Sequence, residues 1–162
     1  MKKHLLVVLA ALVASLGTVA ASHGLTLKEA PKSLMVAEAP ENLNELPVGG
    51  YELAVTTNNE YAARVLITTK KPLKDFNIVA IEYVPNDDPK DLTPPQFKKT
   101  KTLYTLPLFS PDRPIYALVE MMGSLPNIAI YTTEKDLRGL WALSQSGEDG
   151  SFFIHPVGII EN

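Results

Sequence analysis

Cysteine is missing from the whole chain of 162 residues. This absence excludes disulfide bonds, thiol nucleophiles, thiolate metal sites and a lipid anchor attached through an N-terminal cysteine. Histidine is also scarce, with three residues in the chain. Outside the first few residues, a serine triad would have to rely on His23 or His155. We expect His155, which alternates with apolar residues, to be a packed or solvent-facing histidine of the fold.

Motifs for several reaction classes are absent as well. The sequence has no glycine-rich phosphate loop, no His-Glu-x-x-His zinc helix and no Gly-x-Ser-x-Gly nucleophile elbow. These absences argue against nucleotide hydrolysis, zinc proteolysis and α/β-hydrolase chemistry. The chain also lacks a concentrated basic face, because its lysines lie in small groups beside proline-marked turns. We therefore expect no nucleic-acid partner.

The N-terminus is typical of a secretory signal peptide. Lys2 and Lys3 precede an apolar run that ends in small residues, and this run is too short to cross a bilayer comfortably. We predict cleavage after residue 21, which leaves no permanent membrane span and a periplasmic or extracellular protein. Cleavage before His23 is the alternative, and it would expose an amino-terminal histidine of the kind that chelates copper. Without Lys2 and Lys3, 13 basic residues face 18 acidic ones, a formal net charge of −5.

The composition divides the rest of the chain into two parts. Residues 22–47 are rich in Ala, Glu, Lys and Asn without sustained periodicity, so we predict an N-terminal arm or linker with one short helical turn at 34–38. Residues 48–162 carry frequent prolines, which leave few intervals long enough for a sizeable helix. This part is long enough for one domain with a real core.

Period-two alternation dominates residues 48–162. Segments 51–56 and 63–68 alternate in polarity as half-buried strands do, whereas 76–84 and 115–122 are apolar on both faces, which predicts central strands covered on each side. Asp149 and Gly150 predict the turn of a hairpin. Further strands are expected at 102–106, 127–132, 140–146 and 152–157, with a turn rather than a helix between 133 and 141. The fold class predicted is all-β: a single antiparallel β-sandwich of about eight strands, jelly-roll or Ig-like.

Two carboxylates are candidates for catalysis. Glu82 and Glu120 each interrupt an apolar predicted strand, and the hypothesis of a catalytic pair places these two strands in one sheet. A glycosidase places two carboxylates across one sugar bond, as acid and as base or nucleophile. The alternative is that each glutamate faces solvent or pairs with a lysine.

An acidic loop is the candidate for a metal. Asp87, Asp88 and Asp91 lie in a proline-rich connection and offer the oxygen ligands that calcium prefers. Their spacing does not match an EF-hand, so a solvated acidic turn is the alternative.

Aromatic residues on neighbouring predicted strands are the candidate for ligand binding. A flat row of rings formed by Trp141, Tyr131 and Tyr116, with Tyr104 nearby, would stack on sugar faces if it were exposed. Core packing is the alternative for each ring.

From these observations we expect an exported, non-catalytic domain that binds a partner protein or a cell-envelope glycan and needs no cofactor. Two other hypotheses remain open at this point. One is a small glycan hydrolase that uses Glu82 and Glu120, and the other is a structural subunit assembled through strand edges.

Overall fold

The computed structural model describes residues 33–46, 50–88, 90, 96–123, 125–134 and 139–158. Within these ranges the chain forms nine strands and one short 3-10 helix, and it contains no α-helix. The predicted signal peptide lies outside the described residues. The elements are β1 (Leu34–Glu38), η2 (Leu43–Glu45), β2 (Glu52–Val55), β3 (Ala63–Thr69), β4 (Leu73–Val84), β5 (Gln96–Phe109), β6 (Ile115–Val119), β7 (Ile128–Tyr131), β8 (Leu140–Gln145) and β9 (Phe152–Gly158).

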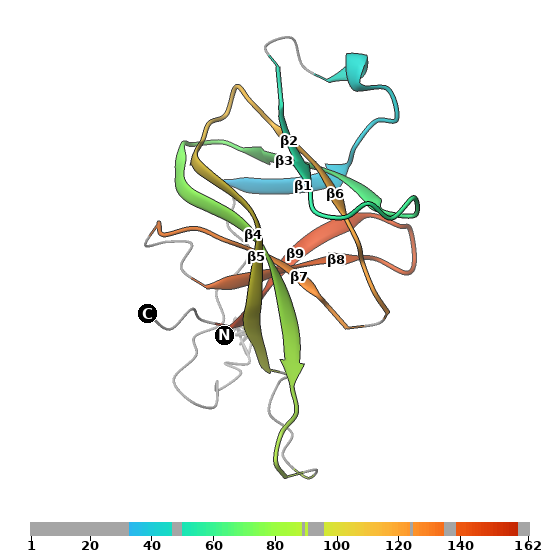
Figure 1. Cartoon of the computed structure of the whole chain (residues 1–162), viewed down its shortest axis with the longest axis vertical. Helices are drawn as coiled ribbons and strands as arrows, with labels where there is room; N and C mark the ends of the chain where they lie inside the picture. Colours follow the sequence, from blue (N-terminus) through green and yellow to red (C-terminus); the bar gives the residue numbers. More distant parts are fainter. Residues whose placement is uncertain are drawn as a thin grey trace, which may run out of the picture.

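The strands form two sheets, which confirms the all-β prediction (Figure 1). The four-stranded sheet has the order β1-β3-β6-β2, and the five-stranded sheet has the order β5-β4-β7-β8-β9. All pairs are antiparallel except β2 and β6, which run parallel. This pair departs from the purely antiparallel sandwich predicted, and it is possible because β3, β4 and β5 intervene along the chain and no tight hairpin links the two strands.

The main core lies between the sheets and depends on the two strands predicted to be central. β4 lies between β5 and β7, and β6 lies between β3 and β2. Phe76 and Ile78 of β4 are buried in the same cluster as Ile115 of β6. The Phe76 ring lies 4.9 Å from the ring of Phe109, measured between centroids. The apolar runs at 76–84 and 115–122 therefore contain interior strands of the two sheets, as predicted.

A second apolar cluster explains why β4 is apolar on both faces. Val79 and Ile81 are buried together with Ala129, Leu140 and Ala142 in a cluster separate from the main core. Alternation along each strand places this cluster on the other face of the five-stranded sheet. The start of β5 also lies against the end of β9, because a Cβ atom added to Gly158 would be 3.3 Å from the carbonyl oxygen of Phe97.

Two local predictions have clear outcomes. The short helical turn predicted at 34–38 is wrong: these residues form β1, which pairs with β3 from Leu34 to Glu38. The hairpin predicted around Gly150 is confirmed, because β8 and β9 pair antiparallel and Gly150 has a positive φ of 75°. The Ser151 backbone N–H and hydroxyl bind the Asp149 carboxylate and lower its pKa, so Asp149 serves the turn.

The predicted turn between 133 and 141 lies partly outside the described residues. Gly139, at its end, has a φ of 132°, and a Cβ atom there would lie 2.8 Å from the Gly158 carbonyl oxygen. Only glycine fits this position without a shift of β9.

Candidate functional site

In β2, the small side chain faces the core and the larger apolar side chains are exposed. Ala54 is fully buried in the main core, whereas the larger Leu53 and Val55 are 50% and 49% exposed. Ala54 lies beside Ala117 of β6 in the sheet, and both side chains are buried in the main core. The sequence predicted a half-buried strand here, and the structure shows that its apolar face is the outer one.

Among the residues that the structure describes, the backbone of β2 is paired on one side only, with β6. The N–H of Glu52 donates to the Pro114 carbonyl, and the N–H of Thr56 donates to the Leu118 carbonyl. In a parallel ladder every second residue faces the neighbour, so the N–H and C=O groups of Leu53 and Val55 point away from β6. Among the described residues, no hydrogen bond to these groups is found. β2 therefore presents an open edge.

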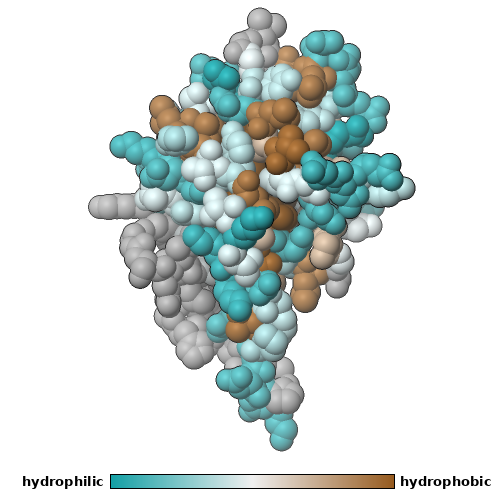
Figure 2. All heavy atoms as spheres, in the orientation of Figure 1, coloured by the Kyte–Doolittle hydropathy of each residue, from teal (hydrophilic) through white to brown (hydrophobic). Residues whose placement is uncertain are grey.

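Further apolar surface surrounds this edge. On the outer face, Leu53 lies beside Tyr116 and Val55 lies beside Leu118, and both of these residues of β6 belong to a small apolar cluster that includes Leu46. Figure 2 shows apolar side chains gathered over the upper half of the molecule, where the four-stranded sheet lies in Figure 1. The β2 edge thus combines unpaired backbone groups with exposed apolar side chains.

Hydrogen bonds hold the chain in place where it leaves β2. The Glu120 carboxylate accepts hydrogen bonds from the Thr57 hydroxyl (3.0 Å) and from the Asn59 side-chain amide (3.2 Å). The Thr56 hydroxyl donates to the Leu118 carbonyl at 2.8 Å. Glu120 therefore fixes the end of β2 against β6.

The structure does not bring the two candidate catalytic glutamates together. Glu82 belongs to β4 in the five-stranded sheet, whereas Glu120 follows β6 in the four-stranded sheet. Glu82 is exposed, and its carboxylate lies 3.7 Å from the Lys98 ammonium group. The expectation that the two strands have a sheet in common is therefore wrong, because they became central strands of different sheets.

The candidate aromatic row is not an exposed platform. Trp141 is only 3% exposed and packs in the main core, and Tyr116 is 6% exposed in the cluster on the opposite sheet. Tyr131 is partly exposed, with the Lys99 ammonium group 5.3 Å from its ring centroid. The rings lie in different layers because their strands belong to different sheets or present different faces.

The structure describes two of the three candidate calcium ligands of the acidic loop. Asp87 and Asp88 are exposed, and the Asp88 carboxylate accepts the backbone N–H of Lys90 at 2.8 Å, while Asp91 lies outside the described residues. Across the part of the chain that the structure describes, no group of three metal-binding side chains is found.

One polar pair of the five-stranded sheet did not emerge from the sequence. The Ser144 hydroxyl and His155 Nε2 lie 3.1 Å apart, and burial lowers the pKa of His155. Ser144 also lines a surface pocket of about 240 Å³ beside Met121, Met122 and Leu125. No carboxylate hydrogen-bonded to His155 is found among the described residues, so the triad is incomplete there. The cross-strand pairing of β8 and β9 would have revealed the pair.

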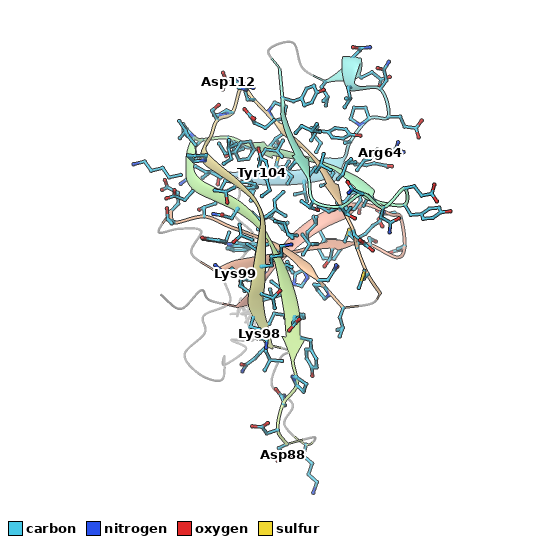
Figure 3. The ribbon with its side chains drawn as sticks, viewed as in Figure 1. Arg64, Asp88, Lys98, Lys99, Tyr104 and Asp112 are labelled. Carbon is cyan, nitrogen blue, oxygen red and sulfur yellow. The ribbon has the colours of Figure 1, made fainter. Side chains whose placement is uncertain are left out.

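β5 is an edge strand of the five-stranded sheet, and its features differ from those of β2. Lys98, Lys99 and Lys101 are exposed along it, and Figure 3 shows the first two on the lower part of the hairpin. Burial and the nearby Glu52 carboxylate raise the pKa of Tyr104, so β5 lies within electrostatic reach of β2. β5 also has two bulges opposite β4, at the unpaired residues Thr100 and Leu103.

Searches with protein-family models, among curated proteins and among solved structures found no match to this chain. The described residues contain no helix that is long and apolar enough to span a membrane.

Proposed function

We propose that this protein is an exported, non-catalytic module that binds a partner protein by accepting an extended segment as an additional strand beside β2. The observation that carries this proposal is the open edge of β2, with its unpaired backbone groups and the exposed side chains of Leu53 and Val55. Strand addition uses main-chain hydrogen bonds for affinity and alternate side chains for specificity. Both components are present at this edge.

The other hypotheses from the sequence have less support. Stacking on a glycan needs exposed rings, and Trp141 and Tyr116 are buried. Glycoside hydrolysis needs two carboxylates across one bond, and Glu82 and Glu120 lie in different sheets with separate partners. Protein binding at the strand edge is therefore the proposal that we retain.

Site-specific photo-cross-linking in cells that export the full chain tests this proposal. A benzophenone amino acid at Val55 should form an adduct with a protein, and the same group at the exposed Thr102 of β5 should not. Leu53→Pro, which removes a backbone donor of the free edge and no bond to β6, should abolish the Val55 adduct. Equal adducts from both positions, or no effect of Leu53→Pro, would contradict strand addition.

A further inference from the structure

The chain itself contains a segment with the pattern that the β2 edge requires. Residues Gly24-Leu25-Thr26-Leu27-Lys28 alternate apolar and polar side chains as a strand does, and they precede β1 outside the described residues. We propose that these residues of a second copy of the chain are the strand added to β2. This inference rests on the proposed function, since it names the occupant of the same edge.

The side chains of both segments match best in one antiparallel register. With Leu27 opposite Leu53 and Leu25 opposite Val55, all four apolar side chains lie on the outer face of the sheet. The same register places Lys28 opposite Glu52, whose carboxylate lies 3.0 Å from the Arg113 guanidinium group, so Lys28 joins an existing ion pair. A parallel arrangement of the same leucines would place Lys28 opposite Thr56 instead. The antiparallel register is therefore the one that brings the lysine of the added strand to a carboxylate of β2.

This register also satisfies the free backbone groups of the edge. Leu53 and Val55 both direct their N–H and C=O groups away from β6. Directly opposite residues at such positions exchange both of their hydrogen bonds, so the added strand makes about four of them. The outer row of Leu53 and Val55 then gains apolar neighbours and loses solvent contact.

The position of β1 favours a second copy over the chain's own segment. β1 and β2 occupy opposite edges of the four-stranded sheet. An added strand beside β2 would be four spacings from β1, about 19 Å. The six residues from Lys28 to Leu34 span about 21 Å when fully extended. The segment would have to run taut and straight across the end of the sheet, where Ser110 to Pro114 lead into β6.

Each copy would then carry both a donor segment and an acceptor edge. Because the donor segment and the acceptor edge are different parts of the chain, the contact is heterologous, and copies add to one another head to tail. The short strand buries much less surface than a standard stable interface. We therefore expect assembly that grows with protein concentration and dissociates on dilution.

A complementation experiment tests this assembly. One full-length variant keeps the donor segment and has a blocked edge (Val55→Pro), and the other keeps the edge and has a blocked donor (Leu25→Asp with Leu27→Asp). In sedimentation velocity, the unaltered protein should show species that grow with concentration, and each variant alone should remain monomeric. Their mixture should form a dimer and nothing larger. If Val55→Pro impairs folding by its melting curve, Val55→Lys replaces it.

Disulfide trapping tests the register, because the chain has no cysteine of its own. Cys introduced as Leu27→Cys in one copy and Leu53→Cys in another should form a disulfide on mild oxidation, since directly opposite residues of this type have Cα atoms about 5.5 Å apart. Met35→Cys is the matched control acceptor, because Met35 is 48% exposed on β1 at the other edge. Trapping with Met35→Cys at an equal rate would contradict the register.

The outcomes separate this inference from the proposed function. A mixture that stays monomeric overturns the second copy as occupant, and dimers that Val55→Pro does not prevent overturn β2 as the acceptor. If the mixture stays monomeric while the cross-linker at Val55 still captures another protein, the inference fails and strand addition stands. If neither the mixture nor the cross-linker gives a product, both fail.

Discussion

β2 and β5 are both edge strands near the same side of the molecule, yet only β5 is protected against further pairing. β5 is long, carries exposed lysines and Pro107, and has two bulges that interrupt a regular edge. Proteins commonly protect edges with such features to avoid association. β2 is short and regular, and it exposes Leu53 and Val55. Of these two edges, β2 is therefore the one at which a further strand can pair.

The largest expected effect is a difference in stability between substitutions on the two sides of β2. Ala54→Pro removes a donor from the ladder with β6 and places a ring in the core. We therefore expect the free energy of unfolding to fall by about 2–4 kcal/mol. Val55→Pro removes only a donor of the free edge and should cost less than about 1 kcal/mol. Urea unfolding of both variants measures the difference. Equal losses of stability would show that both sides of β2 are engaged.

The second effect comes from giving β2 the protection of β5. Val55→Lys places a charge on the free edge, so partner binding or self-association should weaken by about tenfold or more. Stability should change by less than about 0.5 kcal/mol, because Val55 is half exposed. Val55→Thr, which keeps the β-branched shape, is the control and should retain more of the binding. Sedimentation across a concentration series measures the association affinity of each variant.

Removing the protection of β5 should have a smaller effect in the opposite direction. Lys99→Val with Lys101→Val makes this edge more apolar, so association should increase and should no longer depend on the β2 edge. The loss of the Lys99 contact with Tyr131 should cost about 0.5–1 kcal/mol of stability. Light scattering of this variant with and without Val55→Pro distinguishes the two edges. Suppression of all association by Val55→Pro would show that the bulges and Pro107 protect β5 by themselves.

The smallest expected effect is on the pH dependence of stability, and it should not alter association at the β2 or β5 edge. Burial lowers the folded-state pKa of His155, so the unfolded chain binds a proton more readily. The free energy of unfolding should therefore fall as pH decreases from above the unfolded histidine pKa of about 6.5 through the lower folded value. His155→Gln should remove this part of the pH dependence in urea titrations. The opposite sign would mean that the protonated ring is the stabilised form.

Local patterns in the sequence predicted the strands whose environment is decided locally. Asp149 and Gly150 indicated the β8–β9 hairpin through turn chemistry, and the apolar runs of β4 and β6 indicated central strands. β1 was missed because its short Ala- and Glu-containing segment is a strand only through its pairing with β3. That pairing is a long-range property that propensity does not report.

The candidate sites were less predictable for the same reason. Alternation showed that β2 has two different faces, but not that the face with Ala54, beside Ala117, is the one that meets the core. Sheet membership likewise decided that Glu82 and Glu120 are separated and that Trp141 is buried. These are properties of the assembled sheets.

The buried position of Trp141 gives the protein an internal optical reporter. It is the only tryptophan of the chain, and it lies between the two sheets. Its fluorescence emission should shift to longer wavelength when the sheets separate and water reaches the indole. A strand that adds to β2 from outside leaves that layer intact, so it should leave the emission unchanged. One fluorescence spectrum thus distinguishes a change of partner from a loss of fold, without any attached label.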